Sequence, residues 1–126
     1  MTKKIISTTE APAAIGTYSQ AVAAHGCLYI SGQIPLVAST MEIVSENIED
    51  QISQVFVNLA AICKAADTDL NQVIKFTIYL IDLSHFAKVN QFMEALLQTP
   101  YPARAVVEVS ALPKGVQIEI DAVVAL

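Results

Sequence analysis

The last apolar segment of the chain, Val116–Val124, alternates along its length as the side chains of a β-strand do. One row consists of apolar residues, namely Ile118, Ile120, Ala122 and Val124. The opposite row carries Glu119 and Asp121. A strand of this kind buries one face, so it belongs to a sheet that is covered on one side and open on the other.

The segment before it, Ala103–Val109, alternates as well, and Ser110–Gly115 between the two contains the proline and glycine of a turn. We therefore predict that the two strands form a hairpin. If their apolar rows pack under helices, the second sheet face displays four ionisable side chains: Arg104, Glu108, Glu119 and Asp121. That face is either solvated, as is common for antiparallel sheets, or buried between subunits with its charges at the margin.

Two helices are predicted upstream. In Glu46–Ala66 apolar residues recur at three- and four-residue spacing, and Ser45 is the expected N-cap. Ser84–Leu97 carries a second apolar stripe. Four further strands are predicted at Lys3–Thr8, Tyr18–Ala24, Cys27–Gln33 and Val73–Ile81. This order predicts an α+β fold, with one domain over residues 1–126 and both helices on one face of a single sheet.

The composition leaves more apolar surface than one small domain can bury, because 54% of the 126 residues are hydrophobic and only 15% are charged. The sequence has neither a signal-peptide pattern nor the roughly 20-residue apolar run of a membrane-spanning helix. We therefore expect a closed homo-oligomer in the cytoplasm, with Cys27 and Cys63 as reduced, buried thiols.

Charge and ligand spacing exclude two further kinds of site. The net charge of −5 argues against nucleic acid as a partner, because phosphate-binding surfaces are basic. His25 and His85 belong to no Cys, His or Asp cluster at metal-ligand spacing. We therefore expect neither a nucleic-acid surface nor a metal site.

Short motifs occur in a recognisable order along the whole chain. They are Ala11-Pro12-Ala13-Ala14-Ile15-Gly16, Tyr18-Ser19-Gln20-Ala21, Ser31-Gly32-Gln33-Ile34-Pro35, Phe86-Ala87, Val89-Asn90, Pro102-Ala103-Arg104, Val107-Glu108-Val109, Leu112-Pro113 and Ile118-Glu119-Ile120. Each motif alone is unspecific. Their order and spacing together resemble the RidA (YjgF) family.

The resemblance implies a chorismate-mutase-like α+β fold and a homotrimer with substrate clefts between subunits. It implies the activity of a 2-iminobutanoate/2-iminopropanoate deaminase, which hydrolyses 2-aminoacrylate and 2-imino acids to 2-keto acids and ammonia without metal or organic cofactor. Arg104 matches the residue that grips the substrate carboxylate, and Glu119 matches the acid that holds the attacking water and shuttles its proton. Five further residues match positions lining the pocket: Tyr18, Ser31, Gly32, Asn90 and Val106. Gly32 is expected to let the backbone approach the ligand closely.

Two departures from the family pattern bear on the pocket. Val106 stands where cysteine is common, so a cysteine nucleophile is excluded there, and the Gln98–Tyr101 loop is shorter than in the best-known members. A non-catalytic trimer that binds keto acids or acts like a chaperone is the main alternative. RNA cleavage is a second alternative, which the acidic charge disfavours. The preferred imino acid cannot be read from the sequence.

Overall fold

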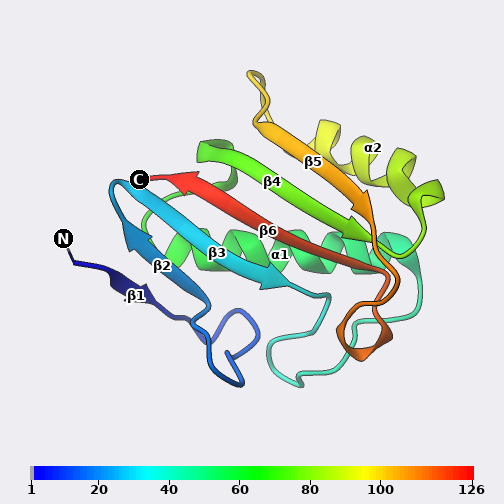
Figure 1. The fold of residues 1–126 in the computed structure, drawn as a ribbon, viewed down its shortest axis with the longest axis horizontal. Helices are drawn as coiled ribbons and strands as arrows, with labels where there is room; N and C mark the ends of the chain where they lie inside the picture. Colours follow the sequence, from blue (N-terminus) through cyan, green and yellow to red (C-terminus); the bar gives the residue numbers. More distant parts are fainter. Residues whose placement is uncertain (1) are drawn as a thin grey trace.

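Six strands of one mixed sheet form the framework of the computed structural model, which describes residues 2–126 (Figure 1). In chain order the strands are β1 (Lys4–Ile6), β2 (Ala21–Ala24), β3 (Cys27–Gln33), β4 (Val73–Leu80), β5 (Ala103–Glu108) and β6 (Ile118–Ala125). Their order across the sheet is β1-β2-β3-β6-β4-β5. Neighbouring strands are antiparallel except β4 and β5, which run parallel.

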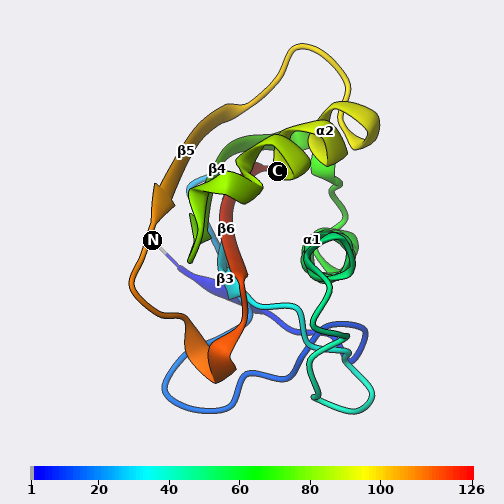
Figure 2. The same ribbon diagram turned by 90° about the vertical axis from the view of Figure 1, so that its right-hand side faces the viewer.

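Both long helices, α1 (Ile48–Ala65) and α2 (Phe86–Leu96), cover the same face of the sheet (Figure 2). The apolar stripe of α1 packs on β3 and β6, and α2 lies beside α1. Fully buried side chains from both layers meet in the core, among them Ile52, Leu59, Phe76, Ile78 and Ile120. The predicted α+β arrangement with two helices on one face is therefore confirmed. Within residues 2–126, no helix has both the length and the apolar character needed to cross a bilayer.

The predicted hairpin between the last two strands is wrong. β6 lies between β3 and β4, and β5 pairs with β4 in parallel at the sheet edge. A parallel pair needs a crossover connection, and α2 supplies it. The segment Ser110–Gly115, which ends in the short helix η3 (Pro113–Gly115), carries the chain to the centre of the sheet rather than into a tight turn. β6 occupies the centre because its whole apolar row is buried, whereas β5 is largely exposed, as an edge strand can be.

The residue that caps the start of α1 differs from the predicted one. Asn47, not Ser45, is the N-cap: its Oδ1 accepts hydrogen bonds from the backbone N–H groups of Glu49 (2.8 Å) and Asp50 (3.2 Å). The Ser45 hydroxyl instead accepts a hydrogen bond from the Asn47 N–H at 3.0 Å, in the loop just before the helix. Ser45 and Asn47, two residues apart, are both able to cap a helix, and the backbone geometry decides between them.

The other boundaries shift where loops are held by side chains. β3 matches the predicted Cys27–Gln33. β2 is shorter than predicted because Gln20 serves the preceding loop, its side-chain amide donating to the carbonyl of Pro12 at 2.8 Å. β1 is also shorter than predicted, and the second helix begins as the 3₁₀ turn η2 (Leu83–His85) before α2.

The two cysteines form no disulfide, as predicted. Cys63 is buried in α1, and this burial raises the pKa of its thiol to about 11. Cys27 is only partly buried, so the prediction of full burial holds for Cys63 alone.

Candidate functional site

The strand register decides which ionisable side chains share a face of the sheet. Residues paired across parallel strands point to the same side, and Arg104 pairs with the core residue Phe76. Arg104 and Glu108 therefore lie on the face that the helices cover. Glu119 and Asp121 alternate with the buried row of β6 and lie on the open face. The prediction that these four residues share one face is wrong, because β5 follows the register of β4 rather than that of β6.

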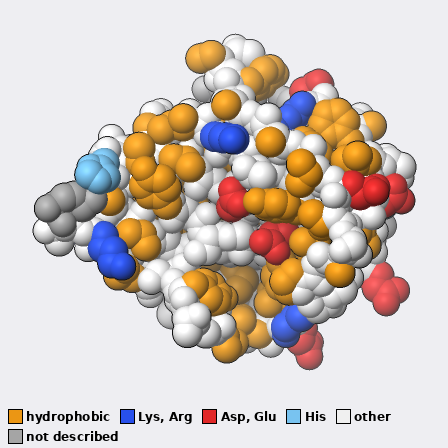
Figure 3. Space-filling view, viewed as in Figure 1, with side chains coloured by type: hydrophobic (Ala, Val, Ile, Leu, Met, Phe, Trp, Pro, Cys, Tyr) orange, Lys and Arg blue, Asp and Glu red, His pale blue; other side chains and the backbone are white. Residues whose placement is uncertain are grey.

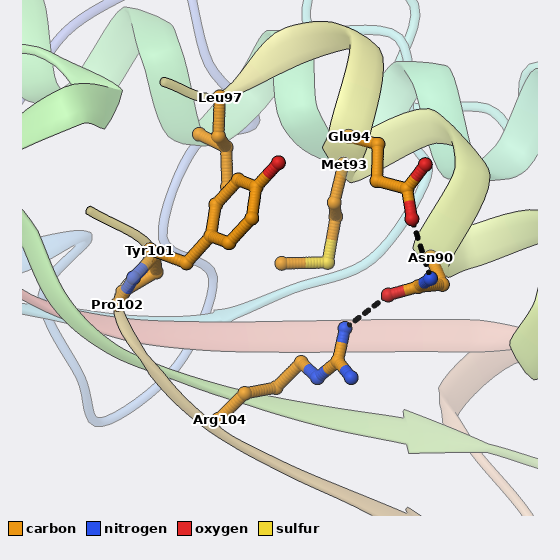
Figure 4. A pocket seen from close by; sticks show the side chains of 7 residues that line it. All are labelled: Asn90, Met93, Glu94, Leu97, Tyr101, Pro102 and Arg104. Atoms are coloured by element: carbon orange, nitrogen blue, oxygen red, sulfur yellow. Dashed lines mark hydrogen bonds between the residues drawn. The ribbon is translucent and has the colours of Figure 1, made fainter. Parts of the chain in front are cut away.

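Arg104 stands at the exposed edge of the sheet, where α2 holds its side chain. Its Nη1 donates to Oδ1 of Asn90 at 2.8 Å, and its guanidinium carbon lies 4.9 Å from the centre of the Phe86 ring. The Asn90 amide donates in turn to Oε1 of Glu94 at 3.1 Å (Figure 4). Phe86, Asn90 and Glu94 are four residues apart and so share one face of α2. These residues, together with Val106, are called the arginine cluster below.

A hollow of about 290 Å³ opens beside the guanidinium. It is lined by Asn90, Met93, Glu94, Leu97, Tyr101, Pro102 and Arg104 (Figure 4). A second hollow is lined by Leu83, Phe86, Arg104 and Val106, and the Val106 side chain there packs against the core. The guanidinium thus borders two largely apolar surfaces. This setting suits a small molecule that carries a carboxylate and a short apolar remainder.

Glu119 lies in a different hollow, on the open face of the sheet. This hollow of about 490 Å³ is lined by Tyr18, Ser31, Gly32, Ile34, Pro113 and Glu119. The Ser31 hydroxyl donates to the backbone carbonyl of Ser19 at 2.6 Å, which ties β3 to the loop before β2. The hydroxyl of Tyr18 accepts a hydrogen bond from the Ile15 N–H at 3.3 Å, and half of the Tyr18 surface is exposed.

The surroundings of Glu119 favour its protonated form. Partial burial raises the pKa of Glu119, and the negative charge of Asp121 raises it further. Asp121 accepts a hydrogen bond from the hydroxyl of Tyr79 at 3.0 Å. Burial and this hydrogen bond raise the pKa of Tyr79. A carboxyl whose pKa is raised toward neutrality is suited to accepting and returning a proton. Tyr18, Ser31, Gly32, Tyr79, Glu119 and Asp121 are called the acid cluster below.

Glu108 has a structural partner instead. Its Oε1 accepts a hydrogen bond from the backbone N–H of Leu83 at 3.0 Å, at the start of η2. The clusters include residues that were not predicted as site residues: Phe86 and Glu94 on α2, and Tyr79 on β4. The four-residue spacing of Phe86, Asn90 and Glu94 was a usable signal for the two on α2. Nothing local marks Tyr79, because its contact with Asp121 depends on strand pairing.

A single chain therefore gathers the predicted site residues into two groups. Arg104, Asn90 and Val106 meet at the helix-covered edge, whereas Tyr18, Ser31, Gly32 and Glu119 meet on the open face. The first group can bind an anion, and the second can move a proton. No group of three potential metal ligands occurs in the part of the chain that the structure describes.

Known proteins match the chain over nearly its whole length. The family model described as Endoribonuclease L-PSP matches residues 8–126. A Mus musculus protein named 2-iminobutanoate/2-iminopropanoate deaminase is 45% identical over 121 residues, covering 96% of this chain and 90% of that protein. A RutC family protein of Sinorhizobium fredii is 48% identical, covering 96% of each chain. The crystal structure of RidA from the Antarctic bacterium Psychrobacter sp. PAMC 21119 is 50% identical in sequence, with a TM-score of 0.94 over 98% of this chain and 99% of that one.

Proposed function

Because this chain belongs to the RidA (YjgF) family, we propose that it hydrolyses 2-aminoacrylate and other small 2-imino acids to 2-keto acids and ammonia. The observation that carries the proposal is the environment of Arg104. Asn90 and Phe86 orient its guanidinium, yet within residues 2–126 it forms no ion pair. An arginine held in this way is prepared for an anion from outside the chain, and a carboxylate fits its fork with two parallel hydrogen bonds.

We also propose a homotrimer in which the arginine cluster of one subunit faces the acid cluster of the next. The two clusters lie on opposite sheet faces of one chain, so a second chain is needed to bring an arginine and an acid to one substrate. The open face carries uncovered apolar surface, including Tyr29 and Val107, around a few acidic side chains (Figure 3). Covering this face would also bury the surplus apolar surface that the composition predicts.

In the proposed mechanism, Arg104 holds the carboxylate and Glu119 acts on the water. Glu119 takes a proton from water as the water oxygen bonds to the carbon of the protonated imine and the C=N electron pair moves to nitrogen. Glu119 then gives this proton to the nitrogen of the resulting carbinolamine. The C–N bond breaks and ammonia leaves with the bonding electron pair, while the hydroxyl gives its proton to the Glu119 carboxylate as the keto group forms; Glu119 then releases this proton to solvent. An enamine first takes a proton from solvent on its terminal carbon, which converts it to the protonated imine. Imine hydrolysis needs little more than positioning and one acid–base group.

The remaining residues of the proposed site define its walls. Tyr18, Ser31 and Gly32 border the space in which the water lies, and Val106 makes the wall beside Arg104 apolar. Asn90 acts through Arg104 by fixing its guanidinium. Two free cysteines fit a reducing compartment, so we place this activity in the cytoplasm.

A coupled assay tests this proposal. Threonine dehydratase generates 2-iminobutyrate, and the release of 2-ketobutyrate is timed with and without the protein. Acceleration that disappears in Arg104→Ala and in Glu119→Gln is the expected result. Saturable keto-acid binding without acceleration would support the non-catalytic alternative, and RNA degradation in a parallel reaction would support the ribonuclease that the family model's description names. A monomer in light scattering would refute the proposed trimer.

A further inference from the structure

We propose that Gly32 is a positioning residue for Glu119: because Gly32 has no side chain, the Glu119 carboxylate can lie directly against the backbone of residue 32. The consequence for catalysis rests on the deaminase function proposed above, whereas the geometry does not. Gly32 thereby has a role beyond lining the pocket, because it determines where the proposed proton-transfer group stands.

The space beside Gly32 is already occupied. A Cβ atom built on Gly32 would lie 2.9 Å from Cδ and 3.3 Å from Cγ of Glu119, and still closer to Oε2. Real Cβ atoms essentially never approach other atoms so closely, so any side chain at this position forces the carboxylate to move. The Glu119 side chain therefore crosses from β6 onto the backbone of β3.

Backbone conformation does not account for this glycine. Gly16, Gly26 and Gly115 have positive φ angles of 124°, 73° and 70°, a region that favours glycine, but Gly32 does not lie in that region. A Cβ at Gly26 or Gly115 would meet nothing within 4 Å. Gly32 is thus the glycine at which the Glu119 side chain, rather than a positive φ, occupies the place that a Cβ would need.

A β-bulge turns Gly32 toward Glu119. Ile30 pairs with Ala122 and Gln33 pairs with Ile120, so two residues of β3, Ser31 and Gly32, lie opposite the single residue Asp121 of β6. Ile30 and Gln33 are both buried, which shows that the extra residue shifts the alternation of β3 between them. Bulges of this kind re-aim residues beside functional sites. Here the bulge directs Gly32 to the open face, where the Glu119 side chain lies.

The groups that face Glu119 define how its titration responds to displacement. Asp121 lies on its own strand, Tyr79 lies on β4, and Tyr18 comes from the loop before β2, while β3 contributes only the uncharged Ser31 and Gly32. Burial is the larger of the two causes that raise the pKa of Glu119. If a methyl group at residue 32 pushes the carboxylate into water, the pKa of Glu119 should fall toward its ordinary value.

The test uses Gly32→Ala in the full chain and two measurements. The first is a carbon-13 NMR titration of the Glu119 carboxyl, assigned by the signal that is absent in Glu119→Gln. We expect a lower pKa in Gly32→Ala, accompanied by a loss in kcat of roughly 10²-fold and a nearly unchanged affinity for a keto acid. An unchanged titration would overturn the proposal. This measurement does not require activity, so a wild-type protein without deaminase activity would refute the proposed function alone.

The second measurement separates space for Glu119 from a general need for glycine in the bulge. Urea unfolding is compared for wild type, Gly32→Ala, Glu119→Ala and the double variant. If Gly32 serves Glu119, the added methyl group should destabilise the wild-type background and cost little once the carboxylate is gone. Equal destabilisation in both backgrounds would contradict the proposal. The double variant removes the clash, so it remains measurable even if Gly32→Ala alone does not fold.

Discussion

Subunit mixing tests the proposed division of the site between neighbouring chains. Arg104→Ala lacks the guanidinium that binds the substrate carboxylate, and Glu119→Gln lacks the proton-transfer group, so each homotrimer should be inactive. In a mixed trimer, however, the intact arginine cluster of a Glu119→Gln subunit can face the intact acid cluster of an Arg104→Ala subunit. Activity should therefore return when two inactive proteins are combined.

The expected magnitude follows from the two sheet faces. In an equal, random mixture each interface receives an intact arginine face in half of the cases and an intact acid face in half, so about one quarter of the interfaces are complete. The two variants are co-refolded from urea, native mass spectrometry confirms mixed trimers, and the 2-iminobutyrate assay should report about a quarter of the wild-type acceleration.

A matched control uses wild type mixed equally with the double variant Arg104→Ala/Glu119→Gln. A site shared between subunits should again leave about a quarter of the wild-type rate, whereas a site within one subunit should leave about half. Mixed trimers without any recovered activity in the first experiment would refute the reasoning. That result would mean that Arg104 and Glu119 do not act across one interface.

Four further predictions concern single groups. Asp121→Asn removes a negative charge that raises the pKa of Glu119, so the acidic limb of the pH profile of kcat should move to lower pH. If the limb does not move, burial alone raises the pKa of Glu119. Glu119→Gln should raise the free energy of unfolding in urea at pH 8 but leave it unchanged well below pH 4. The raised pKa of Glu119 means that the folded state is more stable with the carboxyl protonated, and this stability is lost as the pH rises through the folded pKa. Glutamine keeps the neutral form at pH 8, whereas below the unfolded pKa of about 4.3 the wild-type carboxyl is protonated in both states. Arg104→Lys should weaken keto-acid binding by roughly tenfold or more in calorimetry, since an ammonium group cannot replace the two parallel N–H donors of the guanidinium. Unchanged affinity would exclude bidentate binding of the carboxylate. Cys63 should resist alkylation at pH 7 in mass spectrometry, because burial raises its pKa to about 11.

Much of the local structure was predictable because it depends on the period of the sequence. The alternation of Ile118, Ile120 and Ala122 predicted both the strand β6 and its buried row. The apolar stripe that begins at Ile48 predicted α1, and the limits of β3 were predicted to the residue. Caps and short strands were less predictable, since more than one nearby polar residue, here Ser45 and Asn47, can cap the start of a helix.

The individual site residues were also named from the sequence, through motifs whose order resembles one family. Arg104 and Asn90 do meet, as do Gly32 and Glu119. What the motifs do not contain is the distribution of these residues over two faces. In Ala103–Val109 the alternation assigned the apolar row to the helices, but pairing with β4 turns the row of Arg104 and Glu108 to that face instead.

The amino-acid sequence by itself thus determined most of the elements, the buried row of β6 and the chemical groups available, because these follow from side-chain type and local spacing. Only the tertiary structure decided that β6 enters between β3 and β4, which turns Arg104 to the helices and Glu119 to the open face. It also decided that the carboxylate of Glu119 lies on Gly32, two residues that are far apart in the chain. Strand order and register arise from contacts between distant segments, and no local period encodes them.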